Sequence, residues 1–251
     1  MHNKDKTASI IVIGDEILSG RTQETNVAFI AKHLSEMGIK LSEVRIIPDE
    51  SDVIQKTVLE LKEVDDYIFT TGGIGPTHDD ITTESIAKAF NRKLETNEEA
   101  FELMSLRCKE LDIKMNDGTK KMAILPEKVK IIANNVSAAP GFQIENVFVF
   151  AGIPNIMQNM FLNIRGALKS SSRFYSKSLF VIIGESHLAP TLQELQEKYS
   201  AIAVGSYPSQ MSDGRWSVTV VLRGKDNDKV ESAFNALREN LNIKNIESKE
   251  V

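Results

Sequence analysis

A glycine-rich segment joins an apolar run to a polar segment with helical spacing, and it reads Thr71-Gly72-Gly73-Ile74-Gly75-Pro76-Thr77. The apolar run before it, residues 67–70, predicts a short buried strand, and the residues from Ile81 onward predict the start of a helix. A glycine-rich turn between strand and helix exposes backbone N–H groups and directs a helix N-terminus at its ligand, which suits a phosphate. We therefore predict an anion-binding loop here, in which Gly72, Gly73 and Gly75 provide positive φ angles or close approach of a ligand.

Two adjacent carboxylates, Asp79 and Asp80, end this loop and follow His78. A carboxylate repels a phosphate, so these acids are not expected to bind one directly. Three roles stay open for them: ligands of a metal ion, acid–base groups, and caps of the following helix. His78 could contact a phosphate or a metal ion, or it could simply be a loop histidine in solvent; the sequence favours neither role.

A second polar cluster, Gly14-Asp15-Glu16, directly follows the buried strand predicted for residues 8–13. Asp49 follows the next predicted strand, residues 41–47. In open α/β sheets ligands bind beyond the carboxyl ends of the strands, which is where both features and the glycine loop are placed. The alternatives are that Asp15 and Glu16 are solvated acids of a strand-exit loop and that Asp49 only caps the next helix.

Several other positions are weaker candidates. Asn26 precedes a run with helical spacing and is a plausible helix cap. Lys121 could pair with a phosphate, although surface lysines are common. Pro140-Gly141 and Gly152 look like backbone turns near strand ends, and Gly152 lies just before a helix that Pro154 opens. The sequence has no His/Cys set with zinc spacing, no GxxxxGK[ST] loop and no Ser-centred nucleophile elbow, so electrostatic catalysis with a divalent metal fits the carboxylates better than a covalent mechanism.

Strands alternating with helices predict an open α/β sheet with helices on both faces. The remaining strands of this part are expected at residues 129–132 and 147–150. A later helix, opened by Asn97, is expected to bury one face made of Phe101, Met104, Cys108 and Leu111.

The serine-rich residues 169–173 interrupt this pattern and predict a boundary between a domain at 1–169 and a smaller one at 173–245. The second domain is expected to be a small α+β lobe with the order β-α-β-β-α. Its strands are predicted at residues 174–183, 201–204 and 216–222, with a short helix after the first and a longer helix after the last. In its last strand, Trp216, Val218, Val220 and Leu222 alternate on one face.

The bulk composition excludes some classes of function. The 251 residues are 41% hydrophobic and 26% charged, with a net charge of −5, which argues against a broad basic face and hence against nucleic acid as a partner. The single cysteine, Cys108, cannot form an internal disulfide, so a reducing cytoplasm fits best. No signal-peptide core is recognisable near Met1, and no apolar run approaches the roughly 18–20 residues that span a bilayer, so no membrane contact is expected.

Taken together, these motifs resemble the MoaB/Mog molybdopterin-binding fold, and in particular its CinA competence/damage-inducible branch. The resemblance covers nearly the whole chain and also rests on two segments of the second domain, Leu188-Ala189-Pro190-Thr191-Leu192 and Gly205-Ser206-Tyr207-Pro208. It implies a three-layer α/β domain that binds molybdopterin-like or ADP-ribose-like phosphates and a tendency to form homo-oligomers. The departures from the family pattern are Ser137-Ala138, Ala151 and Ile156. Full-length CinA proteins also carry a nicotinamide-nucleotide deamidase domain, and we expect that activity to be absent from this chain.

The combined expectation is a protein that binds a phosphorylated small molecule and acts as a metal-dependent pyrophosphatase of the ADP-ribose type. The alternative is a non-catalytic module that binds molybdopterin or a nucleotide. The catalytic candidates are Asp80, Asp79 and Asp49, and the candidate ligands of a Mg²⁺, Mn²⁺ or Co²⁺ ion are Asp15, Asp79 and Asp80. The expected ligand-binding residues are Gly14, Asp15, Glu16, Asn26, Thr71, Gly72, Gly73, Gly75, Pro76, Thr77, Lys121, Pro140, Gly141 and Gly152.

Overall fold

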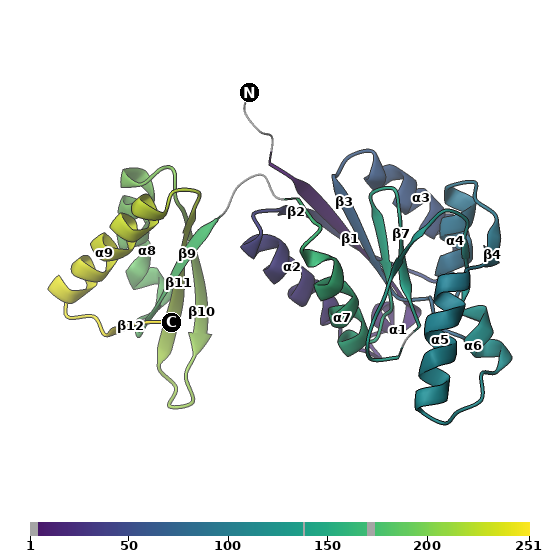
Figure 1. Cartoon of the computed structure of the whole chain (residues 1–251). Coiled ribbons are helices and arrows are strands. Elements are labelled where there is room, and N and C mark those ends of the chain that lie inside the picture. The colour runs from purple at the N-terminus through teal and green to yellow at the C-terminus, as the bar shows by residue number, and fades with distance from the viewer. Residues whose placement is uncertain (1–4, 138, 170–173) are drawn as a thin grey trace. The chain divides into compact units, whose positions relative to one another are not determined.

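The structure is a computed structural model that describes residues 5–137, 139–169 and 174–251. It divides into two compact units, Met1–Ser171 and Ser172–Val251, each of which is described separately (Figure 1). Most of the predicted boundary segment, residues 170–173, lies outside the described residues, as does Ala138.

The first unit is built on a six-stranded sheet whose parallel strands end at one edge. Its order is β2 (Lys40–Ile47), β1 (Thr7–Ile13), β3 (Tyr67–Thr71), β8 (Val147–Phe150), β7 (Gly141–Ile144) and β6 (Lys130–Ile132). The pairs β2–β1, β1–β3 and β3–β8 are parallel, whereas β8–β7 and β7–β6 are antiparallel. The segments that leave β1, β2, β3 and β8 therefore meet at the same edge, as expected for ligand binding in such sheets.

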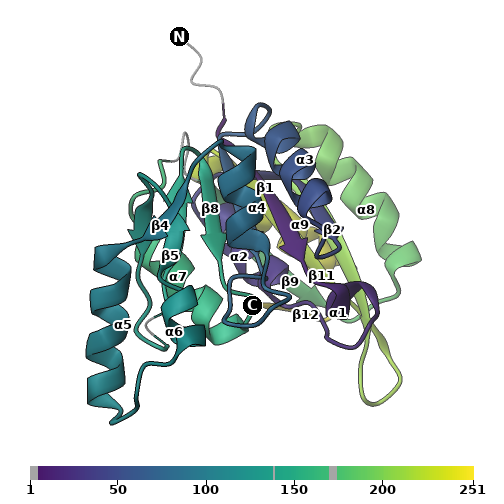
Figure 2. The same ribbon diagram turned by 90° about the vertical axis from the view of Figure 1, so that its right-hand side faces the viewer.

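Helices cover both faces of this sheet and make three layers. On one face, α2 (Asn26–Glu36) and α7 (Pro154–Arg165) pack against Ile10, Val12 and Phe69. On the other face, α3 (Ser51–Lys62), α4 (Thr82–Ala89) and α5 (Glu98–Glu110) share a core with Ile11 and Ile13, and α3 and α4 lie side by side (Figure 2). The predicted three-layer α/β fold is confirmed.

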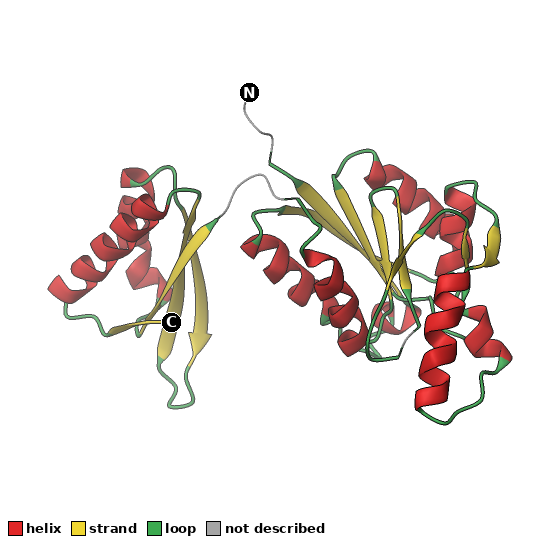
Figure 3. Cartoon of the chain, viewed as in Figure 1, coloured by secondary structure: helices red, strands yellow, loops and turns green. Residues whose placement is uncertain are grey.

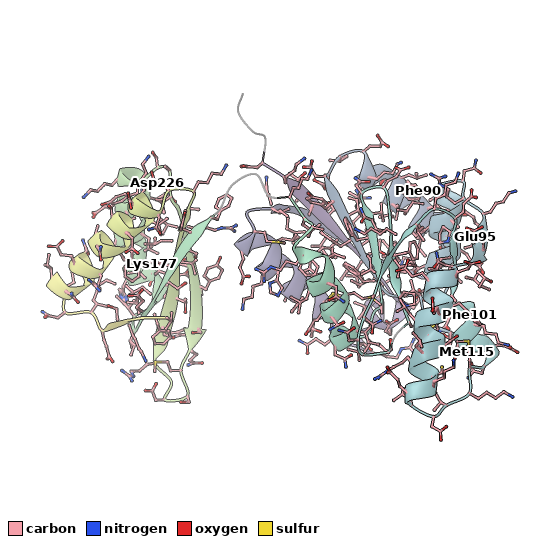
Figure 4. The ribbon with its side chains drawn as sticks, in the orientation of Figure 1. Phe90, Glu95, Phe101, Met115, Lys177 and Asp226 are labelled. Atoms are coloured by element: carbon pink, nitrogen blue, oxygen red, sulfur yellow. The ribbon has the colours of Figure 1, made fainter. Side chains whose placement is uncertain are left out.

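Short elements complete the unit: the helices α1 (Asp15–Leu18) and α6 (Asp117–Lys121), and a two-stranded sheet of β4 (Leu94–Thr96) and β5 (Ile124–Pro126). Asn97 caps α5 as predicted, because its side chain accepts a hydrogen bond from the N–H of Ala100. The predicted buried face of α5 is only half correct. Met104 and Cys108 are buried, but Phe101 (labelled in Figure 4) is 38% exposed and Leu111, which follows the last helical residue, is 51% exposed.

The second unit is a four-stranded antiparallel sheet with two helices packed on one face (Figure 3). Along the chain it consists of β9 (Tyr175–Val181), α8 (Glu185–Lys198), β10 (Ala203–Gln210), β11 (Trp216–Gly224), α9 (Asn227–Ile243) and β12 (Ser248–Glu250), and the sheet order is β10-β11-β9-β12. This β-α-β-β-α-β order with its split strand pairs is the ferredoxin-like arrangement.

The helix-facing side of this sheet is apolar, with charged residues at its margin. Lys177 of β9, labelled in Figure 4, faces α9, since its Nζ lies 2.9 Å from a carboxylate oxygen of Glu231 and 4.7 Å from the centre of the Phe234 ring. Val218, Val220 and Leu222 are buried there as predicted.

Three features of the second unit differ from the sequence expectation. Trp216 is 57% exposed, because it begins β11 beside the tight turn that follows β10. β10 continues to Gln210, whereas the prediction ended it at Val204. The prediction was too short because the second half of this strand is largely polar and shows no apolar alternation. The three-residue strand β12 was not predicted, because Ser248–Glu250 is polar and has no strand pattern of its own.

Candidate functional site

A cavity of about 570 Å³ lies at the sheet edge where the parallel strands end. This volume is in the range of small-molecule sites. Its walls come from the segments that follow β1, β3 and β8, from Met122 after α6, and from two residues between β6 and β7: Glu16, Thr22, Gly72, Gly73, Ile74, Gly75, Pro76, Asp80, Met122, Ser137, Ala139, Ala151, Gly152, Ile153, Pro154 and Ile156. Most of the glycine loop, Gly72–Asp80, therefore lines a cavity at the carboxyl edge of the sheet, the edge at which the sequence places it.

Glycine is required by the backbone at the start of the loop. Gly72 and Gly73 have φ angles of +107° and +67°, a region that other residues rarely adopt. The N–H of Gly72 donates to the carbonyl of Phe150 at 3.1 Å, and a Cβ on Gly72 would lie 2.1 Å from the carbonyl oxygen of Ile13. The ends of β1, β3 and β8 are thus packed so closely that no side chain fits between them.

The far end of the loop is held by Asp80. Its Oδ2 accepts a hydrogen bond from the N–H of Thr77 at 2.8 Å and another from the Thr77 hydroxyl. A Cβ on Gly75 would lie 2.6 Å from the same oxygen. Asp80 does line the cavity, but this oxygen closes the turn, and α4 begins two residues later at Thr82, whose N–H donates to the carbonyl of Gly73.

Lys121 has a different role from the phosphate contact that was expected. Its Nζ donates to the carbonyl oxygens of Thr77 and, at 3.2 Å, of Asp80, and it is not among the residues that line the main cavity. It therefore ties α6 to the end of the glycine loop. No local sequence pattern reveals this contact, because the partners are 44 and 41 residues apart in the chain.

Carboxylates gather beside the loop around Asp49. Its Oδ2 accepts a hydrogen bond from the N–H of Asp15 at 3.0 Å, and a Cβ on Gly73 would lie 3.4 Å from its Oδ1. Burial raises the pKa of Asp49, and the negative charges of Glu16, Asp15 and Asp79 raise it further, against the lowering effect of the Asp15 hydrogen bond. Asp49 does not cap the next helix, since the N-cap of α3 is Glu50 and no side chain caps that helix. It accepts instead from the first residue of α1 and lies next to the glycine loop, so the alternative that it faces this edge of the sheet is the correct one.

The exposed end of the loop carries Asp79 and His78. Their side chains are 71% and 99% exposed. Hydrogen bonding by Thr77 is the main cause that lowers the pKa of Asp79, with His78 and Lys121 adding smaller charge effects. Asp79 therefore stays ionised at neutral pH and adds to the negative charge near Asp49.

The expected metal set of Asp15, Asp79 and Asp80 is not preformed. Across residues 5–137, 139–169 and 174–251, no three acidic, His or Cys side chains converge closely enough to hold an ion by themselves, and Asp80 is turned toward Thr77 instead. The charged side chains that act on Asp49 are all carboxylates: Glu16, Asp15 and Asp79. Such a set suits a hard cation that shares its coordination with substrate phosphates, as Mg²⁺ commonly does.

Asn26 does not cap α2. The Glu24 carboxylate does so, by accepting hydrogen bonds from the N–H groups of Asn26 at 2.7 Å and Val27 at 3.0 Å. Asn26 is 6% exposed as a residue, and its side chain instead donates from Nδ2 to the carbonyl of Gly152 at 2.8 Å. It thus joins α2 to the loop that leaves β8, at the wall of the cavity.

Two expected ligand contacts lie elsewhere. Pro140 and Gly141 are buried at the start of β7 and do not line the cavity. A Cβ on Gly141 would lie 2.4 Å from the carbonyl oxygen of Val149, so this glycine serves strand pairing. The apolar wall formed by Ile74, Met122 and Ile153 was not predicted, because apolar residues carry no chemical signature in a sequence.

The raised pKa of Asp49 makes a prediction about stability. A carboxyl whose pKa is higher in the folded than in the unfolded chain costs stability once it ionises. Asp49→Asn keeps an acceptor for the N–H of Asp15 and should therefore raise the Tm of the ligand-free protein at pH 7. The gain should fade as pH falls through the raised pKa and vanish below the ordinary value of 3.8. Thermal unfolding from pH 3 to 8 measures this. Asp52→Asn, on the exposed side of α3, is the matched control and should give no gain.

Comparison with known proteins agrees with the fold described above. Residues 9–170, more than half of the chain, match the family described as "Probable molybdopterin binding domain", and residues 173–250 match "FAD synthase, middle domain". A protein of Archaeoglobus fulgidus is 35% identical over 94% of this chain and 98% of its own length. A competence-damage inducible protein of Acetivibrio thermocellus is 32% identical over 87% of this chain. The matched part covers only 54% of the length of that protein.

Among solved structures, the protein CinA of Thermoplasma acidophilum is 32% identical, with a TM-score of 0.60 over 64% of this chain and 97% of its own. Within the part of the chain that the structure describes, no helix has the length and apolar character needed to cross a membrane. With the fold and these relatives in agreement, the chain belongs to the molybdopterin-binding-domain family, on its CinA-like branch.

Proposed function

We propose that the cavity binds a nucleotide diphosphate of the ADP-ribose type and that the protein hydrolyses its diphosphate with the help of a divalent cation. One observation carries this proposal: the Asp49 carboxylate accepts a hydrogen bond from the N–H of Asp15 and lies next to Gly73, in the glycine loop that lines the cavity. Negative phosphates and negative carboxylates share a site only when a cation lies between them.

The cavity offers separate environments for the two parts of such a ligand. The glycine loop provides close backbone approach for phosphate, because Gly72 and Gly73 carry no side chains. Ile74, Met122 and Ile153 provide an apolar wall for a ring system. A mixed lining of this kind favours a phosphorylated heterocycle over inorganic phosphate.

Asp49 is the residue that we assign as general base. Its raised pKa makes it a better proton acceptor than an ordinary aspartate, and its position beside Gly73 places it next to the phosphate loop. Hydrolysis adds one water across the bridging P–O–P unit: one P–O bond forms, another breaks, and a proton of the water passes to Asp49. A bound Mg²⁺, Mn²⁺ or Co²⁺, held by Asp15 or Asp79 together with the phosphates, would stabilise negative charge on the leaving phosphate.

A second candidate function is binding without catalysis. It is favoured by the absence of a preformed three-carboxylate group in the described residues. The family description makes a molybdopterin the ligand to consider for this function. In that case the carboxylates around Asp49 would bind a cation that accompanies the phosphate, without transfer of a proton.

Product analysis distinguishes the two functions. The purified protein is incubated with ADP-ribose and Mg²⁺, Mn²⁺ or Co²⁺, and AMP and ribose 5-phosphate are separated by chromatography. We expect both products in equal amounts and none in the presence of EDTA. If the protein binds ADP-ribose but forms no AMP with any of the three metals, the binding function replaces the enzymatic one.

A further inference from the structure

The sheet of the second unit carries its helices on one face only (Figure 1). Both α8 and α9 pack against Leu179, Val220 and Leu222. Successive side chains of a strand point to opposite faces of the sheet, so the residues between these belong to the other face. By the strand register, this helix-free face carries Ser176, Ser178, Phe180, Ala203, Gly205, Tyr207, Ser209, Ser217, Thr219, Val221, Arg223 and Lys249.

Two aromatic residues share one row across the helix-free face. Tyr207 of β10 pairs with Thr219 of β11, Thr219 pairs with Phe180 of β9, and Phe180 pairs with Lys249 of β12. Since β11 separates β10 from β9, the backbones of Tyr207 and Phe180 are about 10 Å apart. The Tyr207 ring leans over Gly205, because a Cβ on Gly205 would lie 3.2 Å from its Cε2 and Oη atoms. Tyr207 is nevertheless 60% exposed, so its ring is available to a planar group.

The charged residues of the helix-free face are all cationic. They are Arg223 and Lys249, and none of the residues that the register assigns to this face is acidic. Lys225 follows β11 directly, and its Nζ lies 5.5 Å from the centre of the Phe174 ring, while the guanidinium carbon of Arg223 lies 4.5 Å from the same centre. The net charge of −5 argues against a broad basic surface, but it allows a local one of this kind.

The combination of rings and cations defines the chemistry of the partner. Aromatic side chains stack bases and cations bind phosphates, and proteins that bind single-stranded nucleic acid use both together. A duplex hides the faces of its bases, whereas a single strand exposes them. Four-stranded sheets with aromatic residues on one face bind single-stranded RNA in this way. The small residues Gly205 and Ser178 beside the aromatic row leave room for a base to approach the sheet.

We propose that the helix-free face of the second unit binds single-stranded nucleic acid, with bases stacked on Tyr207 and Phe180 and phosphates paired with Arg223, Lys225 and Lys249. RNA and DNA share the bases and phosphates that these residues recognise. This binding is independent of the diphosphate chemistry proposed for the first unit, because none of these residues lines that cavity.

The test measures fluorescence anisotropy of the full chain with labelled single-stranded RNA, single-stranded DNA and duplex DNA of one length and mixed sequence. Both single strands should bind more tightly than the duplex. Tyr207→Ala should weaken binding of the single strands about tenfold, the scale of one stacked base, and Tyr207→Phe should bind as the wild type because the ring is kept. Arg223→Ala should lower both the affinity and its dependence on salt, since a phosphate contact is lost.

Trp216→Ala is the matched control. Trp216 is 57% exposed, close to the value for Tyr207, but its register position is on the helix-facing side of β11, so this variant should bind as the wild type. Excess ADP-ribose should not displace the oligonucleotide. The inference is overturned if no single strand binds at low salt, if Tyr207→Ala binds as the wild type, if the duplex binds equally well, or if ADP-ribose competes. A change of oligomeric state in Tyr207→Ala, seen by sedimentation, would show that the face is a protein interface and would also overturn it.

Discussion

Gly73→Val is expected to abolish the stabilisation that ADP-ribose gives the protein, while the chain stays folded. Gly73 has a φ of +67°, and a Cβ there would lie 2.2 Å from Oγ1 of Thr82, the first residue of α4. A β-branched residue resists this φ, so the loop has to move away from the geometry that lines the cavity. The strain of one such residue is about 1–3 kcal/mol, less than the stability of an ordinary domain.

Thermal shift with and without ADP-ribose and Mg²⁺ measures this effect. At a ligand concentration of 100 times Kd, the wild type should gain about 2.7 kcal/mol of stability, and Gly73→Val should gain none. Gly166→Val is the control, because Gly166 ends α7 with a φ of −67° and a Cβ there meets nothing within 4 Å. A folded Gly73→Val protein, as judged by circular dichroism, with an unchanged ligand shift would show that the loop is not the phosphate site.

The parts of the site that the sequence predicts are those with local causes. The positive φ angles of Gly72 and Gly73 are confirmed, because a strand that turns directly into a helix N-terminus needs such residues within a few positions. The common edge for the glycine loop and Asp49 follows from strand order, since residues that leave parallel strands lie at one edge. The three-layer fold follows likewise from the alternation of strands and helices.

The parts that the sequence did not predict depend on contacts between distant segments. Lys121 and Asn26 were recognised as polar residues near the motif, but their partners, the carbonyls of Thr77 and Gly152, lie 44 and 126 positions away. Gly141 looks like a turn residue in the sequence, and only the approach of the Val149 carbonyl shows that it is needed for strand pairing. The roles of these three residues depend on which distant carbonyl each one approaches in the folded chain. The spacing of residues in the sequence does not contain that information.

Asp49→Asn is expected to lower ADP-ribose hydrolysis by ~10²-fold or more, the range that a positioned general base contributes. The amide keeps the size of the side chain and can still accept the N–H of Asp15, which in the wild type donates to Oδ2 at 3.0 Å. It cannot take a proton from water, so the loss reports the missing base. Steady-state measurement of AMP release should show the loss mainly in kcat.

The same substitution is expected to make the folded protein more stable, and this combination separates a catalytic role from a structural one. When a residue that serves folding is replaced, the protein loses both stability and activity. A carboxylate that is held among other carboxylates for catalysis lowers the stability of the protein, so replacing it lowers the activity and raises the stability. Asp52→Asn, three residues further along the chain and exposed, should not change hydrolysis. If Asp49→Asn hydrolyses ADP-ribose at the wild-type rate, the base must be sought among the two carboxylates that line the cavity itself, Glu16 and Asp80.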